Sequence, residues 1–229
     1  DDYEKILSKT VEGSDVYRIN HAGGQTVEVD SATIEVVNKG LEYSRLSGGA
    51  FDITIGKVSD IWNFQEMDDK GNHVGVIPEE GVISEAMNHV DYSCVIVEGN
   101  TIRLTDPAAE LDLGGIAKGY IADKVAEFLE AKGVTSAVVD LGGNIVVIGE
   151  KGETLSNPVG TEFKVGIADP NSEGLLGLLA CKDKTVVTSG TYERYFELDG
   201  KRYHHVLDTK TGYPADTDLL AVTIVADKG

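Results

Sequence analysis

The stretch Leu111-Asp112-Leu113-Gly114-Gly115-Ile116-Ala117-Lys118-Gly119 lies near the middle of the 229-residue chain and leads into a helical pattern. Apolar residues recur behind it at helical spacing until Gly133, where the run ends. The stretch therefore predicts a helix that opens here and carries one apolar face, formed by Ala117, Ile121, Val125 and Phe128. Asp112 and the two glycines stand before the helix, so this turn combines a carboxylate, exposed backbone and the positive charge of Lys118.

Two interpretations of this turn are open. The unpaired N–H groups and positive dipole end of a helix attract phosphate, the glycines leave room for a ligand, and Lys118 adds positive charge. Alternatively, the glycines only reverse the chain and Asp112 caps the helix. A P-loop is excluded because Lys118 precedes Gly119, and the glycine spacing also differs from the dinucleotide-binding fingerprint.

Length and composition limit the fold class. A chain of 229 residues is long enough to bury a core and corresponds to one large domain or two small ones. No linker-like or low-complexity stretch divides it, so we expect a single domain over residues 1–229. No run of about 18 apolar residues is present, which argues against a membrane-spanning segment in this sequence.

The charge and the cysteines exclude several functions. The formal net charge of −19 argues against a general nucleic-acid surface, which needs clustered lysine and arginine. A phosphate-bearing ligand would need a metal ion, a local lysine or a helix N-terminus to overcome this field. Cys94 and Cys181 form no CxxC pair and no metal-binding cluster, so we expect buried free thiols.

Short strands and hairpins alternate with a few helices. Helical patterns cover residues 1–11, residues 31–46 after a capping Asp30 or Ser31, and residues 78–88, with Pro78 in the first turn. Further strands and hairpins are expected at 27–29, 53–56, 94–97 with 102–104, 137–140 with 145–148, 163–168, 185–188, 195–198 with 201–205, and 220–226. This order favours an α+β fold with a largely antiparallel sheet and packed helices.

His205 is the best candidate for acid–base chemistry. An unperturbed histidine titrates near pH ~6.5, so it can move a proton at neutral pH, although a strand histidine can also make only a structural hydrogen bond. Its neighbour His204 points to the opposite face of the strand. A serine hydrolase is excluded by the absence of a Gly-x-Ser-x-Gly elbow, and a zinc site by the absence of a His–Cys cluster.

Isolated carboxylates remain as candidates for a hard cation. Asp52, Asp112 and Asp208 lie in glycine-rich or turn settings. Mg²⁺ takes one or two carboxylates together with backbone oxygens and substrate phosphate, which would suit an acidic protein with a pyrophosphate ligand. For each aspartate alone, a turn or capping role is the simpler interpretation.

Four motifs occur along the chain in this order: Ser47-Gly48-Gly49-Ala50-Phe51-Asp52-Ile53-Thr54-Ile55-Gly56, Leu111-Asp112-Leu113-Gly114-Gly115-Ile116-Ala117-Lys118-Gly119-Tyr120, Thr188-Ser189-Gly190-x-Tyr192-Glu193-Arg194-Tyr195 and His204-His205-Val206-Leu207-Asp208-x-x-Thr211-Gly212-Tyr213-Pro214. In this order and spacing they resemble the ApbE family, whose members are the FAD:protein FMN transferases or flavin-trafficking proteins. The resemblance covers nearly the whole chain. It implies an α+β, single ApbE-like (T-fold-like) domain.

The resemblance implies a Mg²⁺-dependent enzyme that cleaves the pyrophosphate of FAD. It transfers FMN to a Thr or Ser hydroxyl of an acceptor flavoprotein, such as a subunit of an electron-transport complex, and releases AMP. Family members are commonly exported and often lipid-anchored, which implies an extracytoplasmic, membrane-associated lipoprotein. Two alternatives stay open: a FAD-binding or flavin-storage protein without transfer activity, and a FAD pyrophosphatase that yields FMN and AMP.

The resemblance also assigns residues. His205 matches the catalytic base, and Gly115 matches a position where the family supplies a metal ligand, here through its backbone oxygen. The residues that match FAD contacts are Ala50, Phe51, Asp52, Asp112, Lys118 and Leu207.

The sequence departs from the family pattern at three points. Thr10 stands where the family has an aromatic flavin contact. The family's first strand, with its Met-Gly pair, is not found in this sequence. The segment whose Asp and Thr complete the family's metal site would follow Gly229.

Overall fold

The structure is a computed structural model that describes residues 2–64, 66–67, 69, 73–152 and 160–229. The chain divides into two units. Unit 1 comprises Asp1–Ala117 and Glu193–Thr217, and unit 2 comprises Lys118–Tyr192 and Asp218–Gly229.

Unit 1 is a mixed helix and sheet structure. Its helices are α1 (Glu4–Leu7), α2 (Asp15–Asn20), α3 (Ser31–Leu46), α4 (Gly56–Trp62), α5 (Glu80–Met87) and the 3-10 turn η1 (Tyr92–Cys94). Its strands are β1 (Val27–Glu28), β2 (Val95–Glu98), β3 (Thr101–Leu104), β9 (Tyr195–Leu198) and β10 (Lys201–His204). They form an antiparallel sheet in the order β1-β3-β2 and a separate hairpin, β9–β10.

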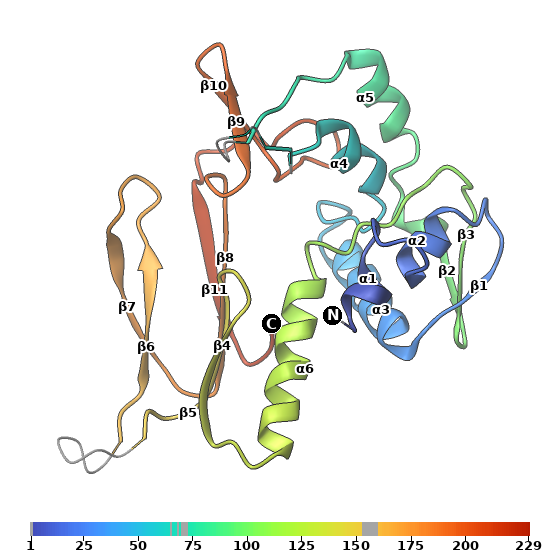
Figure 1. Ribbon diagram of the computed structural model, residues 1–229. Helices are drawn as coiled ribbons and strands as arrows, with labels where there is room; N and C mark the ends of the chain where they lie inside the picture. Colours follow the sequence, from blue (N-terminus) through green and yellow to red (C-terminus); the bar gives the residue numbers. More distant parts are fainter. Residues whose placement is uncertain (1, 65, 68, 70–72, 153–159) are drawn as a thin grey trace. The chain divides into compact units, whose positions relative to one another are not determined.

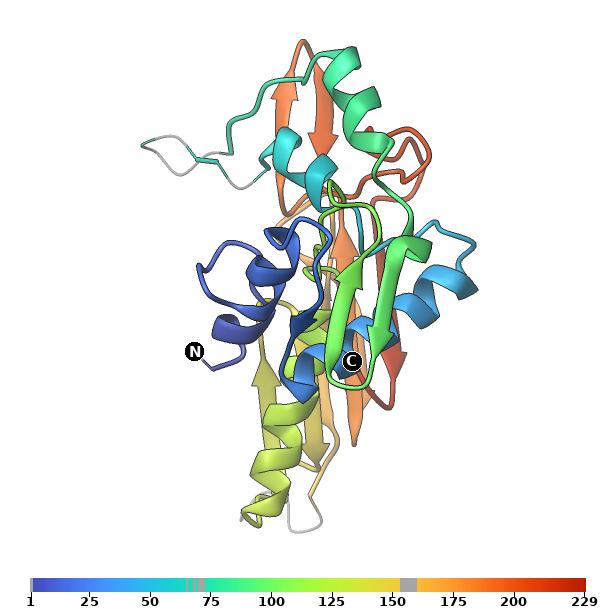
Figure 2. The ribbon, with the colours of Figure 1, turned by 90° about the vertical axis from the view of Figure 1, so that its right-hand side faces the viewer.

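An aromatic core joins the hairpin to two helices in unit 1. Trp62 of α4 stacks near Phe64 and Tyr203, with ring centroids 5.5 and 5.9 Å away, and Phe196 of β9 is 4% exposed. Ile83 of α5 completes this buried cluster. Figures 1 and 2 both show β9–β10 beside α4 and α5. The hairpin late in the sequence is therefore held by residues from its first half.

Unit 2 is built on one antiparallel sheet. Helix α6 (Ala117–Ala131) leads into β4 (Ser136–Asp140), β5 (Asn144–Gly149), β6 (Phe163–Ala168), β7 (Leu175–Cys181), β8 (Lys184–Gly190) and β11 (Ala221–Ala226). The sheet order is β11-β8-β5-β4, and β6 pairs with β7 in a hairpin. Helix α6 packs on Val139, Val146 and Ile148. The β6–β7 hairpin packs on Val147 and Val186, which belong to a separate core cluster. Figure 1 shows the hairpin and α6 on opposite sides of the sheet.

Most of the expected elements are confirmed. The helix at 31–46 begins as predicted, because the Asp30 side chain accepts a hydrogen bond from the Ala32 N–H at 2.8 Å. The expected hairpins, the strand pair 137–140 with 145–148 and the last strand are all present. Both cysteines are free and buried, and burial raises the pKa of the Cys94 thiol to about 11. The α+β class with antiparallel sheets holds.

Two expectations about local structure are wrong, and one strand was missed. The first 11 residues contain only the one-turn helix α1. A separate helix, α2, begins after Ser14, whose hydroxyl oxygen caps it by accepting a hydrogen bond from the Tyr17 N–H. Residues 53–56 are not a strand but a turn into α4, because both oxygens of Asp52 bind nearby backbone N–H groups. Strand β7 was not predicted, since its residues are almost all exposed and lack the alternation of a half-buried strand.

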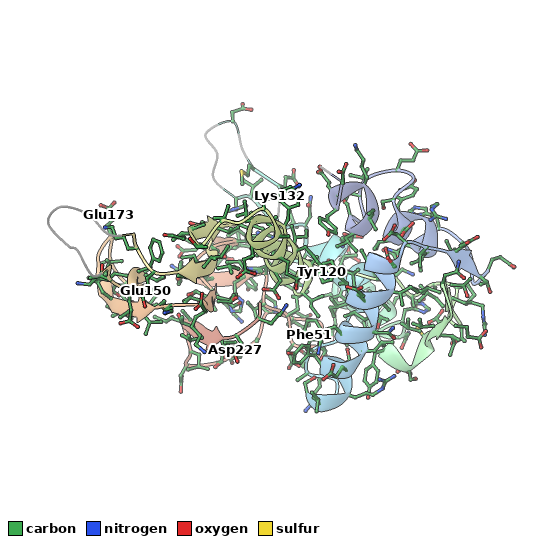
Figure 3. All side chains as sticks on the ribbon, turned by 90° about the horizontal axis from the view of Figure 1, so that it is seen from below. Phe51, Tyr120, Lys132, Glu150, Glu173 and Asp227 are labelled. Atoms are coloured by element: carbon green, nitrogen blue, oxygen red, sulfur yellow. The ribbon has the colours of Figure 1, made fainter. Side chains whose placement is uncertain are left out.

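The central helix differs from its prediction in the face that it buries. Its start is confirmed, since it begins at Ala117, after the glycines. Its buried residues are Gly119, Ala122 and Ala126, whereas Phe128 is 60% exposed. Small side chains let the helix lie close to the sheet, and apolar spacing alone does not reveal that choice. The Phe128 ring instead makes a cation–π contact with the Lys132 ammonium, which lies 5.4 Å from the ring centroid. Figure 3 labels Lys132 near the ribbon of α6.

No helix among the described residues combines the length and apolarity that a membrane crossing requires. The expectation of a single domain over 1–229 stays a prediction.

Glycine substitutions test the packing of α3. A Cβ atom on Gly40 would lie 2.6 Å from Cγ2 of Ile53, which is fully buried. We expect Gly40→Ala to lower the free energy of unfolding by about 1–3 kcal/mol, because overpacking outweighs the better helix propensity of alanine. Urea denaturation followed by circular dichroism measures it.

Gly81→Ala is the matched control, because Gly81 is also helical and a Cβ there meets nothing within 4 Å. We expect it to be neutral or to stabilise by about 0.5 kcal/mol. Equal effects of the two substitutions would contradict the packing described for Gly40.

Candidate functional site

Asp112 organises the glycine turn that precedes the central helix. One carboxylate oxygen, Oδ1, accepts from the Gly114 N–H at 2.8 Å, which closes an Asx turn before the helix. The other, Oδ2, accepts from the Ser59 hydroxyl at 2.8 Å and lies 3.0 Å from the Lys9 ammonium. Asp112 thus shapes the turn through its own bonds, five residues before α6 begins. The capping role predicted for it is replaced by this turn.

Lys9 connects Asp112 to helix α4. Its ammonium donates to the Gly56 carbonyl at 3.3 Å, to the Ser59 hydroxyl at 2.7 Å and to the Asp60 carboxylate at 2.5 Å. Only 14% of the Lys9 side chain is exposed. A cation this buried requires charged or polar partners, and these three groups together with Asp112 supply them.

The ion pair shifts both pKa values toward the charged forms. Burial alone would lower the pKa of Lys9, but the charges of Asp112 and Asp60 and their hydrogen bonds outweigh it and raise the pKa. Burial alone would raise the pKa of Asp112, but the charge of Lys9 and the hydrogen bonds from Gly114 and Ser59 lower it. Asp112 is therefore a carboxylate and Lys9 an ammonium at neutral pH.

The predicted FAD segment at residues 50–52 lies next to this turn. The Asp112 N–H donates to the Ile53 carbonyl at 2.8 Å. A Cβ atom on Gly115 would lie 3.0 Å from Cε2 of Phe51, so the phenyl ring lies directly against the glycine. Figure 3 labels Phe51 beside the end of α3. Two stretches that are separated by about 60 residues in sequence are thus in contact in unit 1.

Asp52 and Ala50 differ sharply in their surroundings. Asp52 is 6% exposed, and its oxygens accept from the Thr54 N–H, the Thr54 hydroxyl and the Tyr92 N–H at 2.8, 2.6 and 3.0 Å. Ala50 is exposed. Asp52 therefore fixes the turn in this structure, and direct contact with FAD stays a prediction for both residues.

His205 follows directly on β10. Its backbone N–H donates to the Arg194 carbonyl at 3.1 Å, and its Nδ1 lies 3.3 Å from the same oxygen. A carbonyl only accepts, so this contact favours the tautomer with the proton on Nδ1 and the lone pair on Nε2. That tautomer is the one a general base needs when it acts through Nε2.

Leu207 lies in the loop behind His205. It pairs with Pro214 in an isolated antiparallel bridge and packs against the aromatic cluster around Trp62. The indole N–H of Trp62 donates to the Gly212 carbonyl at 2.7 Å. The loop that carries His205 and Leu207 is therefore anchored in the core of unit 1.

Lys118 belongs to unit 2, where its side chain is exposed in the first turn of α6. The other predicted site residues, Ala50, Phe51, Asp52, Asp112, Gly115, His205 and Leu207, all belong to unit 1.

The described residues do not complete a metal centre. Among them, no three His, Cys, Asp or Glu side chains lie close enough together to hold an ion. The Asp112 carboxylate is also occupied by protein donors on both oxygens. The Gly115 carbonyl has the hard oxygen that Mg²⁺ prefers, but a single carbonyl is not a site.

Sequence reasoning missed Lys9, Ser59 and Thr209. Lys9 and Ser59 bind Asp112 across gaps of about 100 and about 50 residues, and the Thr209 hydroxyl donates to the Gly49 carbonyl at 2.5 Å across 160 residues. None of the three carries a local motif. Only the folded chain places them at the site.

A family model described as the ApbE family matches residues 1–229. This chain belongs to the ApbE family.

Curated relatives of this ApbE chain carry the name FAD:protein FMN transferase. The protein from Treponema pallidum (strain Nichols) is 37% identical over 98% of this chain, and the protein from Klebsiella pneumoniae (strain 342) is 36% identical over 98%. The chain spans 64% of the length of the first and 67% of the second.

Solved structures agree with the fold. The ApbE protein of Thermotoga maritima superposes with a TM-score of 0.85 at 32% identity, covering 98% of this chain and 70% of that one. The apo flavinyl transferase ApbE of Pseudomonas stutzeri gives a TM-score of 0.81 at 31% identity, covering 99% and 68%. The predicted α+β fold with antiparallel sheets is thereby confirmed as the ApbE fold.

Substitution of Lys9 tests the ion pair. We expect Lys9→Met to lower the free energy of unfolding at pH 7 by about 2 kcal/mol, because Asp112 then stays buried without its cation. The folded-state pKa of Asp112 is lowered, so its contribution is present above its ordinary value of about 3.9 and is lost as pH falls through the folded value. The difference between wild type and Lys9→Met should therefore shrink in acid.

The same linkage sets the alkaline limit. The folded-state pKa of Lys9 is raised, so its contribution to stability is present below pH about 10.4 and is lost as pH rises through the folded value.

Urea denaturation from pH 3 to pH 9 measures how the difference between wild type and Lys9→Met shrinks in acid. Lys39→Met is the control, since the Lys39–Glu42 pair is 53% exposed on each side and water screens it, so its loss should leave stability nearly unchanged. A pH-independent difference would refute the assignment.

Proposed function

We propose that this chain transfers FMN from FAD to a Thr or Ser hydroxyl of an acceptor protein and releases AMP. The observation that supports this most directly is the contact between the two predicted FAD-binding segments, in which the Phe51 ring lies against Gly115 and the Asp112 N–H binds the Ile53 carbonyl. The relatives at 36% and 37% identity are named for the same transfer.

His205 is the proposed general base. Its Nε2 would take the proton from the acceptor hydroxyl while that oxygen attacks the phosphorus on the FMN side of the pyrophosphate. A new P–O bond forms to the acceptor, the P–O bond to the AMP phosphate breaks, and AMP leaves with the bridging oxygen. The Arg194 carbonyl, 3.3 Å from Nδ1, keeps the imidazole in the tautomer and orientation for this step.

A dependence on Mg²⁺ is part of the proposal. The formal net charge of −19 opposes the approach of a pyrophosphate, and a divalent cation would offset it. When bound, such an ion would neutralise charge on the transferring phosphoryl group. We further propose an acceptor that is a flavoprotein subunit of an electron-transport complex, and an extracytoplasmic, lipid-anchored location.

Two alternatives share the same FAD site. A FAD pyrophosphatase would use water in place of the acceptor hydroxyl and yield free FMN and AMP. A flavin-storage protein would bind FAD and release neither. Two observations on the described residues favour the storage alternative. Protein donors occupy the Asp112 carboxylate, and the described residues do not complete a metal centre.

Incubation with FAD, Mg²⁺ and a flavin-acceptor domain tests the proposal. We expect covalent FMN on the acceptor, seen by in-gel fluorescence and intact mass, together with AMP in the solution. The adduct should disappear with EDTA. AMP and free FMN without an adduct would instead establish a FAD pyrophosphatase. If FAD stays bound and neither product forms, the chain would be a flavin-storage protein.

Substitution of His205 tests the base. We expect His205→Ala to lower the transfer rate by at least about 10²-fold, because general-base catalysis contributes roughly that factor, while FAD binding is retained. His21→Ala is the control, since the His21 ring is exposed and stacks on Tyr17. Transfer by His205→Ala at the wild-type rate would show that another group accepts the proton.

A further inference from the structure

The loop behind His205 is closed by its own backbone. The Asp208 N–H donates to the Tyr213 carbonyl at 2.8 Å, and the Gly212 N–H donates back to the Asp208 carbonyl at 2.8 Å. One step further out, the Ala215 N–H donates to the Val206 carbonyl at 2.9 Å. These backbone bonds close residues 206–215 into a turn.

One side of this turn is fixed by packing. Gly212 has a φ of +73°, and a Cβ atom there would lie 2.7 Å from Cγ2 of Ile83 in α5. The Trp62 indole holds the Gly212 carbonyl at 2.7 Å. These contacts set the base of the turn but leave the placement of its outer residues, 208–210, to other bonds.

Thr209 supplies such a bond. Its hydroxyl donates to the Gly49 carbonyl at 2.5 Å, and both residues lie in unit 1. Gly49 belongs to a loop that is itself well held: the Gly49 N–H donates to the Ser44 carbonyl at 2.8 Å, and the Phe51 N–H donates to the Ser47 hydroxyl at 3.0 Å. The Thr209 hydroxyl thus joins two segments that are each closed by their own hydrogen bonds.

The two segments that this hydrogen bond joins carry residues predicted to contact FAD, although Thr209 and Gly49 are 160 residues apart in the sequence. Ala50, Phe51 and Asp52 follow Gly49 directly, and Leu207 and His205 precede Thr209 by two and four residues. A threonine hydroxyl that donates to a backbone carbonyl fixes both a distance and a direction. Loss of the bond would let the two segments separate before the ligand arrives.

We propose that Thr209 is a positioning residue that holds the His205–Leu207 segment at the correct spacing from the Ala50–Asp52 segment, and so sets the affinity for FAD. The inference rests on the proposed function, since both segments are assigned there to FAD. Thr209 touches neither FAD nor the acceptor in this scheme. It acts through Gly49, by reducing the ordering that binding would otherwise require.

Three variants test the proposal. Thr209→Val keeps the shape but removes the donor, Thr209→Ser keeps the hydroxyl, and Thr101→Val removes a comparable bond, from the Thr101 hydroxyl to the Glu98 carbonyl at 2.8 Å, in the β2–β3 hairpin. The dissociation constant for FAD is measured by quenching of flavin fluorescence. Steady-state transfer gives KM and kcat, and thermal melting monitors the fold.

We expect Thr209→Val to weaken FAD binding by about fivefold, the factor that corresponds to one neutral hydrogen bond. KM for FAD should rise by a similar factor, with kcat at saturating FAD within about twofold of wild type. Thr209→Ser should restore both values, and Thr101→Val should match wild type. A merely structural role would lower the melting temperature without this split between KM and kcat.

The outcomes separate the inference from the function on which it rests. Wild-type FAD affinity in Thr209→Val would overturn the positioning role while leaving the transferase intact. A failure of serine to restore affinity, or an equal loss in Thr101→Val, would do the same. A wild-type chain that binds no FAD and forms no adduct would overturn the proposed function, and the role of Thr209 with it.

Discussion

The bonds around the Asp112 carboxylate are the constraint on which the candidate site depends. A partly buried carboxylate is costly unless its oxygens are paired, and here an N–H, a hydroxyl and an ammonium pair them. Each partner comes from a different part of unit 1: Gly114 from the turn itself, Ser59 from α4 and Lys9 from the segment after α1. The carboxylate therefore ties three segments to one point, and the Phe51 ring lies against the turn that results.

The same contact explains why α6 begins only after the glycines. The Asp112 side chain accepts from the Gly114 N–H, and Gly114 and Gly115 have poor helix propensity. The chain makes a turn first, and the helix begins at Ala117. A segment that is neither regular helix nor strand can expose backbone groups to a ligand, and this suits the glycine turn to binding.

Local patterns were enough to predict most of the fold. Asp30 as a cap, Asp199-Gly200 as a hairpin turn and the strand pair around 142–143 each depend on neighbours within a few residues, and each is present in the structure. The errors arose where a distant partner decides. Residues 53–56 have the alternation of a strand, but Asp52 folds them into a turn against Tyr92, 40 residues later. In α6, the choice of Ala122 over Phe128 as the buried residue depends on how closely the sheet approaches.

In the candidate site, too, residues in local sequence motifs were predicted, and residues that only the fold brings to the site were missed. The motifs picked out Phe51, Asp112 and His205, because the residue types and spacings are visible in the sequence. Lys9 carries no such signal, yet it determines how the acidic groups behave. In a chain of net charge −19, a pyrophosphate that approached an unpaired Asp112 and Asp60 would meet two further negative charges. The Lys9 ammonium, 3.0 Å from one carboxylate and 2.5 Å from the other, cancels part of that field inside the protein. For the FAD proposed as ligand, Lys9 would thus lower the electrostatic cost of bringing a phosphate to this turn.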